Sequence, residues 1–193
     1  MLNSNDTMLA TCGSDRMINV WDLRKAKEPV MINTESQSCI MACDWSADDQ
    51  SIISATIEGV INGLDIKTNK MAMKHDTMAL TPDLPSNMIY HLKSVKNYPS
   101  KGNHFTLGAE NRMAHIIDFD PTAKYEAWML EIKQKYEGHS AGIRDITFNS
   151  DCSRLLTGCE DHSLRLWDPK TNEPICLFKG HTDFVVSSTA LPC

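Results

Sequence analysis

One stretch of the chain, residues 155–168, constrains the fold more than any other. Its sequence, LLTGCEDHSLRLWD, places apolar residues on both sides of a short polar segment. Polar and apolar side chains alternate along residues 163–166 and lead into Trp167, a pattern typical of a half-buried strand. The stretch therefore predicts two antiparallel strands joined by a tight polar turn.

The same pattern occurs at three earlier places in the chain. The dipeptides that end it are Trp21-Asp22, Leu64-Asp65, Ile117-Asp118 and Trp167-Asp168, and they follow one another at intervals of 43, 53 and 50 residues. Seven residues before each aspartate lies a polar residue of the predicted turn: Asp15, Glu58, Asn111 or Asp161. Four units in phase indicate a repeat architecture in which each unit is one small sheet.

Gly138-His139 precedes the fourth unit, and Trp167-Asp168 ends it. A Gly-His start and a Trp-Asp end resemble one repeat of the WD-repeat family. The resemblance covers nearly the whole chain, with the third unit as the poorest match. It implies an all-β fold, a β-propeller of four-stranded antiparallel blades that is either incomplete or part of a larger ring.

We expect one propeller region over 1–193, with blades at 1–34, 35–76, 77–132 and 133–179 and the start of another at 180–193. The first blade lacks its innermost strand. Residues 131–137 are expected to extend the outer strand of the third blade or to form a helical turn. The expected strands are 8–12, 17–21 and 30–33; 40–44, 51–55, 60–64 and 70–73; 89–95, 104–108, 114–117 and 125–130; 143–148, 154–158, 164–167 and 175–178; and 184–188.

Two arrangements remain open for these strands. The last strand, at 184–188, joins the first three strands and closes a four-bladed ring, or the chain is a piece of a longer propeller, cut inside a blade at both ends. We favour the piece, because the units resemble blades of larger rings. An open piece exposes apolar blade faces, which further sequence or another chain must then cover.

A polar set in the fourth unit invites two interpretations. A catalytic Thr-His-Asp arrangement is one of them. The resemblance implies the other, a structural tetrad in which the indole N–H bonds the hydroxyl, the hydroxyl bonds the histidine and the histidine bonds the turn aspartate. The tetrad consists of His139, Thr157, Asp161 and Trp167, and the first unit keeps Thr11, Asp15 and Trp21 without a histidine. We therefore expect the fourth blade to be the most rigid and the middle of the chain the least.

Two groups of residues are candidates for partner binding. The residue after each turn position is Arg16, Gly59, Arg112 or His162, and propeller turns of this kind gather around the central channel on one face. Basic side chains there favour an acidic or C-terminal peptide, although ordinary solvation of the turns also accounts for them. Residues 9–24 resemble the Trp-Asp-x-Arg box of cullin-RING ubiquitin-ligase substrate receptors, in which Asp22 and Arg24 would face the ligase adaptor. The alternative is a plain turn with Arg24 in solvent.

Composition narrows the functional classes. The net charge of −6 argues against direct nucleic-acid binding, and the sequence has neither an apolar run of membrane-spanning length nor a signal-peptide pattern. The seven cysteines form no Cys-x-x-Cys pair, so we expect small buried thiols in a reducing compartment, no metal and no cofactor. An enzyme would need chemistry from the loops at 76–87 or 97–104, where no catalytic motif occurs. We expect a non-catalytic scaffold for other proteins in a multiprotein complex of the cytoplasm or nucleus, or alternatively a ligase substrate receptor.

Overall fold

The computed structural model describes residues 1–25, 27–33, 35–76, 89–95, 103–110, 112–119 and 130–189. These residues form strands, turns and bends, with no helix among them. The strands are β1 (Met8–Cys12), β2 (Ile18–Asp22), β3 (Met31–Asn33), β4 (Ile40–Trp45), β5 (Ser51–Thr56), β6 (Val60–Asp65), β7 (Lys70–Asp76), β8 (Ile89–Val95), β9 (Asn103–Ala109), β10 (Met113–Phe119), β11 (Leu130–Glu137), β12 (Ile143–Phe148), β13 (Leu155–Cys159), β14 (Ser163–Trp167) and β15 (Pro174–Lys179).

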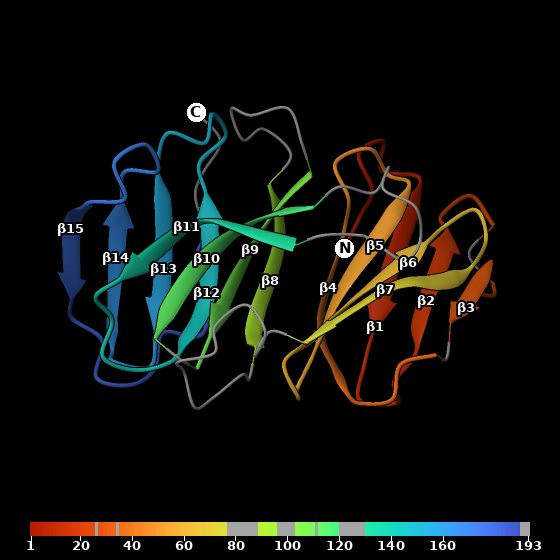
Figure 1. The fold of residues 1–193 in the computed structure, drawn as a ribbon, viewed down its shortest axis with the longest axis horizontal. Coiled ribbons are helices and arrows are strands. Elements are labelled where there is room, and N and C mark those ends of the chain that lie inside the picture. The colour runs from red at the N-terminus through yellow and green to blue at the C-terminus, as the bar shows by residue number, and fades with distance from the viewer. Residues whose placement is uncertain are drawn as a thin grey trace.

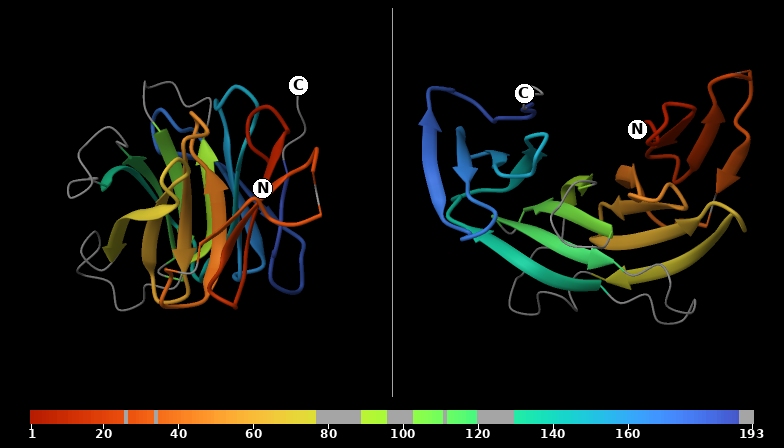
Figure 2. Two further views of the ribbon diagram at one scale, coloured as in Figure 1. Left: turned by 90° about the vertical axis from the view of Figure 1, so that its right-hand side faces the viewer. Right: turned by 90° about the horizontal axis from the view of Figure 1, so that it is seen from above.

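The strands form four antiparallel sheets that follow the chain order. The first sheet has three strands, β1-β2-β3, and the others have four: β4-β5-β6-β7, β8-β9-β10-β11 and β12-β13-β14-β15. The sheets stand side by side in Figure 1, and the view from above in Figure 2 shows them as an open arc. The first strands β4, β8 and β12 contact one another in turn, and β1 contacts β4. Each sheet is thus one blade, and the first blade is a strand short, as the sequence predicts.

The hydrophobic core is divided into three clusters, one between each pair of neighbouring sheets. The pattern follows from strand geometry, because successive side chains point to opposite faces of a sheet. In β2, for example, Ile18 and Val20 are buried against the second sheet, whereas Asn19 and Trp21 point to the other face and are half-buried. A period-2 sequence pattern therefore determines which face of each blade meets its neighbour.

The turns between the second and third strands of the blades share one backbone feature. The residue after the polar turn position has a positive φ in every blade: Arg16 (68°), Gly59 (78°), Arg112 (69°) and His162 (65°). Glycine takes this left-handed conformation freely, whereas a side chain strains it. The four turns thus share the backbone conformation of this one position.

Residues 1–3 lie where the missing strand of the first blade would be. Leu2 forms an isolated antiparallel bridge with Leu9, and the amides of Asn3 and Ala10 donate to the carbonyls of Met8 and Met1. The indole of Trp45, from the second blade, also donates to the carbonyl of Met1 at 3.0 Å. The N-terminal residues thus partly cover the inner edge of β1.

The predicted strand at 184–188 is wrong. One backbone hydrogen bond, from Val185 N to Cys159 O at 3.1 Å, holds the segment against the fourth blade, and Val185 packs on Gly158. A strand needs a ladder of such bonds, and among the described residues no further strand lies beside this segment to provide one. Because the segment does not pair with β1, the four-bladed ring is not formed.

The outer strand of the third blade also differs from the prediction. It is β11, at Leu130–Glu137, rather than residues 125–130, of which 125–129 lie outside the described residues. Residues 131–137 therefore belong to the outer strand, which confirms the first of the two alternatives expected for them, and they do not form a helical turn. The register of β11 against β10 places 133–137 in the third blade, so the expected blade boundary after 132 lies too early.

Candidate functional site

The polar set of the fourth blade is a continuous hydrogen-bonded chain. Trp167 Nε1 donates to Thr157 Oγ1 at 2.9 Å, and the same oxygen lies 2.7 Å from His139 Nε2. His139 Nδ1 lies 2.9 Å from Asp161 Oδ2. The chain links the segment before β12 to β13, to β14 and to the turn between them. The Thr157 hydroxyl is fully buried and is engaged by both the indole and the imidazole, so the network links elements of the blade rather than presenting the hydroxyl at the surface.

The protonation of this network follows from its surroundings. Burial lowers the pKa of His139, against the opposing effect of Asp161, so the imidazole is neutral at pH 7. Burial raises the pKa of Asp161, but hydrogen bonds from Ser163, Ser140 and His139 outweigh it and hold this pKa well below its usual value. A neutral imidazole with its proton on Nδ1 donates to this carboxylate and accepts from Thr157 at Nε2, which matches the geometry.

Only part of the same arrangement exists in the first blade. Trp21 Nε1 donates to Thr11 Oγ1 at 3.0 Å, but Asp15 accepts the backbone amide of Met17 at 3.1 Å within its own turn. The side chains of Thr11 and Trp21 are half-buried, on the face of the first blade that points away from the second. Without a histidine, Asp15 is not linked to this pair.

One cluster near the tetrad has the composition of a metal site. The ligand atoms of His139, Cys159 and Asp161 lie within 4.8 Å of one another. However, both imidazole nitrogens already have partners, and burial raises the pKa of the Cys159 thiol to about 11, which disfavours the thiolate a metal requires. The six described cysteines are free thiols, and Cys176 is exposed, contrary to the expectation that all would be buried.

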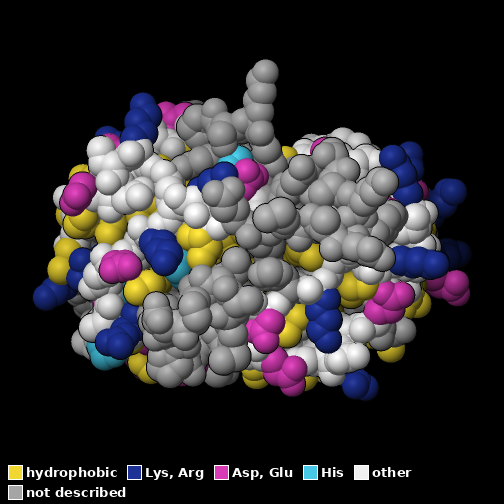
Figure 3. Space-filling model, viewed as in Figure 1, with side chains coloured by type: hydrophobic (Ala, Val, Ile, Leu, Met, Phe, Trp, Pro, Cys, Tyr) yellow, Lys and Arg dark blue, Asp and Glu magenta, His cyan; other side chains and the backbone are white. Residues whose placement is uncertain are grey.

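The candidate basic residues lie in equivalent turns, and all three are exposed. His162 lies 5.9 Å from the Phe184 ring, and the Arg144 guanidinium lies 5.8 Å from the same ring. Arg16 and Arg112 are exposed, each at the same position of its own turn. On the convex side of the arc, seen in Figure 3, cationic and anionic side chains are interspersed.

Within the Trp-Asp-x-Arg segment, Arg24 and Asp22 form an ion pair with two parallel hydrogen bonds. Arg24 Nε donates to Asp22 Oδ1 at 2.9 Å and Nη2 donates to Oδ2 at 2.8 Å, while Asp22 Oδ1 also accepts the Arg24 amide. The hydrogen bonds from Arg24 lower the pKa of Asp22 to about 2. The side chain of Arg24 is 71% exposed, so the pair presents a guanidinium of fixed orientation at the surface.

Arg165 is a residue of this region that the sequence did not single out. Its guanidinium lies 6.0 Å from the Trp167 ring, and its Nη1 is 2.9 Å from where a Cβ of Gly138 would lie. Gly138, with φ of 150°, thus leaves room for the arginine. In the sequence, the glycine of the Gly138-His139 pair is the feature that indicates this contact, because a larger residue there would collide with the arginine.

The fold and the polar network together define a class of protein: a β-propeller region of short antiparallel blades, with blade turns tied down by a buried hydroxyl–imidazole–carboxylate chain. The family model for the WD domain, G-beta repeat, matches residues 2–22 and 130–168, which hold the two Trp-Asp pairs. These two regions are thus WD40 repeats, and distant relatives extend the similarity to most of the chain.

Similar proteins span several complex-forming classes. E3 ubiquitin-protein ligase COP1 of Arabidopsis thaliana is 23% identical over 98% of this chain and 34% of the relative. The serine-threonine kinase receptor-associated protein of Gallus gallus is 26% identical over 89% of this chain and 54% of the relative. Pre-mRNA-processing factor 17 of Saccharomyces cerevisiae is 21% identical over 87% of this chain and 33% of the relative. The chain spans between 13% and 54% of the length of such relatives. None of the described residues belongs to a helix long and apolar enough to cross a membrane.

Proposed function

We propose that this chain is a non-catalytic interaction scaffold, acting in the cytoplasm or nucleus, whose blades and turns bind other proteins in a multiprotein complex. Rigid blades present preformed surfaces, and a preformed surface loses less conformational entropy on binding. The polar network supports this assignment, because its groups bond one another and brace the turns. The basic turn residues Arg16, Arg112 and His162 would contact an acidic or C-terminal peptide.

The observation that carries the proposal is a pair of apolar blade faces at the two ends of the arc. On the first blade this face includes Leu9, Trp21 and Ile32, and Ile32 is 48% exposed. On the last blade it includes Leu166 and Phe178, and Phe178 is 46% exposed.

Each of these end faces has a buried counterpart inside the arc. Trp21 is equivalent to Trp167, which is 1% exposed beneath the third blade. Apolar surface of this kind is normally covered. We propose that further blades, from more of the same polypeptide or from another chain, cover both faces.

Photo-crosslinking tests whether these faces are covered in the native complex. A benzophenone amino acid placed at Ile32 or Phe178 should form adducts with neighbouring polypeptide, which a gel and mass spectrometry identify. Ile57, which is 38% exposed but lies on a turn, is the matched control. Adducts from Ile57 alone, or from none of the three positions, would contradict the proposal.

The second candidate function is that of a substrate receptor for a cullin-RING ubiquitin ligase. The fixed and exposed guanidinium of Arg24 favours it, because a pre-oriented arginine suits recognition of an adaptor carboxylate. Lys170 provides a control, because its amide donates to Asp168 Oδ1 at 2.8 Å in the equivalent turn of the fourth blade. Loss of adaptor binding in Arg24→Ala but not in Lys170→Ala would support this function, and equal binding by both variants would exclude it.

A further inference from the structure

The second blade has lost the large side chains that fill the fourth blade around its tetrad. Counting back from the aspartate that ends the third strand of each blade, Ser36 takes the place of His139. In the same way Asn62 replaces Arg165, and Leu64 replaces Trp167. An imidazole, a guanidinium and an indole are thus exchanged for three much smaller side chains.

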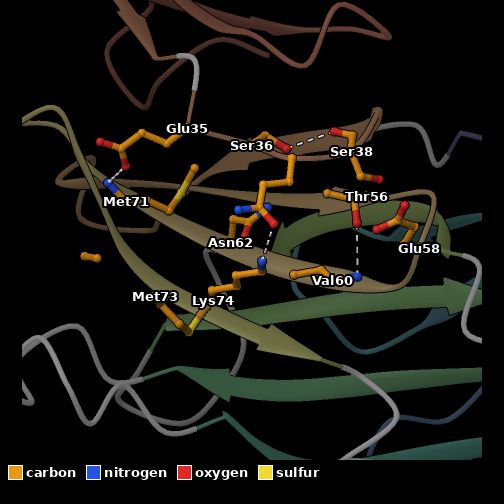
Figure 4. Close-up of a pocket in the computed structure, with 12 residues that line it drawn as sticks. Glu35, Ser36, Ser38, Thr56, Glu58, Val60, Asn62, Met71, Met73 and Lys74 are labelled. Atoms are coloured by element: carbon orange, nitrogen blue, oxygen red, sulfur yellow. Dashed lines mark hydrogen bonds between the residues drawn. The ribbon is translucent and has the colours of Figure 1, made fainter.

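A cavity of about 250 Å³ lies at this place in the second blade. Figure 4 shows Asn62 in its middle, Glu58 and Ser38 toward one end and Glu35 with Met71 toward the other. Met71 and Met73 supply apolar walls. The volume falls below the roughly 300–1,000 Å³ of pockets for drug-sized ligands, so it suits a single side chain.

Three of the polar groups that line this cavity have no hydrogen-bond partner among the described residues. Asn62 is 4% exposed, and its side-chain amide forms no hydrogen bond with the described part of the chain. The Ser38 hydroxyl is likewise buried and unpartnered, at 9% exposure. Glu58, the counterpart of Asp161, is exposed rather than buried, and its carboxylate forms no ion pair with the described part of the chain. Buried polar groups normally have partners, because leaving them unpaired is unfavourable.

From these observations we propose that the cavity binds an arginine side chain of a partner protein. The fourth blade fills the same place with its own Arg165 and His139, both of which are planar nitrogen groups. A guanidinium offers five N–H donors in a plane, enough to bond the Glu58 carboxylate, the Asn62 carbonyl oxygen and the Ser38 hydroxyl together.

The chemistry of the cavity selects against other occupants. The charged residues that line the cavity are Glu35, Glu58 and Lys74. Their net charge of −1 favours a cation. Glu35 already accepts the Met71 amide at 2.6 Å and Lys74 donates to Gln37 at 3.2 Å, so Glu58 is the carboxylate left for a ligand. Packing of the flat guanidinium and its alkyl stem on the methionines favours arginine over lysine. The inference rests on the proposed scaffold role, because the arginine belongs to a partner.

A small-molecule probe tests the cavity without any partner. N-acetyl-arginine amide is titrated into the full chain, and the amide resonances are followed by two-dimensional NMR, with N-acetyl-lysine amide as the comparison. We expect saturable shifts confined to residues 35–38 and 56–62 with the arginine probe, and at least a fivefold weaker effect with lysine. Glu58→Gln should weaken arginine binding about tenfold, the effect of losing one charge-assisted hydrogen bond.

Two further variants complete the test. Asn62→Arg places the fourth-blade residue in the cavity and should abolish binding. Glu173→Gln removes an exposed carboxylate from a turn of the fourth blade and should leave binding unchanged. Equal shifts from both probes, or full binding by a folded Glu58→Gln, would overturn the inference. Because the probe needs no partner, this failure is distinct from a failure of the crosslinking experiment, which tests the scaffold role.

Discussion

Replacing Thr157 by valine should destabilise the fourth blade far more than the same change at Thr11 destabilises the first. Valine keeps the shape of threonine but removes the hydroxyl, which leaves two buried groups without partners: Trp167 Nε1–H and His139 Nε2. Each buried group left unpaired costs about 1–3 kcal/mol, so the expected loss is about 3 kcal/mol. Thr11 bonds one indole, that of the half-buried Trp21, and water can replace its hydroxyl at a cost of about 1 kcal/mol or less.

Native-state hydrogen exchange with mass spectrometry measures this difference blade by blade. A loss of about 3 kcal/mol in the fourth blade corresponds to roughly a hundredfold faster exchange of the amides in β12–β15. Thr11→Val should accelerate exchange in β1–β3 by about fivefold or less. Thr157→Ser keeps the hydroxyl and should retain most of the protection. Equal effects of Thr157→Val and Thr11→Val would show that the network does not brace the fourth blade.

Three other changes test separate parts of the structure. Burial, aided by Lys135, lowers the pKa of His115 to about 4, so the unfolded chain binds a proton below pH 6.5 that the folded chain excludes. Stability to urea should therefore be full above pH 6.5 and fall by about 3 kcal/mol toward pH 4, and His115→Leu should remove most of this dependence. Arg16→Gly should stabilise the first blade by about 0.5–1 kcal/mol in thermal melts, because φ is already positive there as at Gly59. Charge reversal of Arg16 and Arg112 together should weaken partner pull-down, and unchanged recovery would show that these arginines are solvated turn residues.

The strands were predictable wherever the turn chemistry and the period-2 pattern agreed. Met8–Cys12, Ile89–Val95 and Ile143–Phe148 coincide with their predicted ranges, because each is bounded by polar or glycine-containing segments. For the outer strand β11 the sequence left two alternatives open at 131–137, an extended strand or a helical turn, although Leu130, Ile132 and Tyr136 alternate there with charged residues. Its pairing with β10, and the burial of Tyr136, define it as a strand. This is tertiary context that a single sequence does not contain.

The segment at 184–188 failed for a different reason. Its sequence, FVVSS, has strong strand propensity, and Val185 does pack on the fourth blade as an incoming strand would. Propensity alone does not make a strand, because the backbone groups of the segment need a neighbouring strand on which to form a ladder. The same reasoning applies to the cavity of the second blade. Each of the substitutions there is visible in the sequence, but whether neighbouring side chains fill the space depends on packing that only coordinates give.

The second and fourth blades have the same fold but differ in whether their polar groups find partners within the chain. In the fourth blade, His139 and Trp167 complete a network that is satisfied internally, so its stability needs no partner. In the second blade, Ser36 and Leu64 leave polar groups that the described chain does not satisfy. Unpaired buried groups weaken a blade, and the group that pairs them on binding regains that free energy as affinity. Restoring the fourth-blade residues in the second blade should therefore raise its stability and lower its affinity for arginine together, and a variant that raised both would separate the two effects.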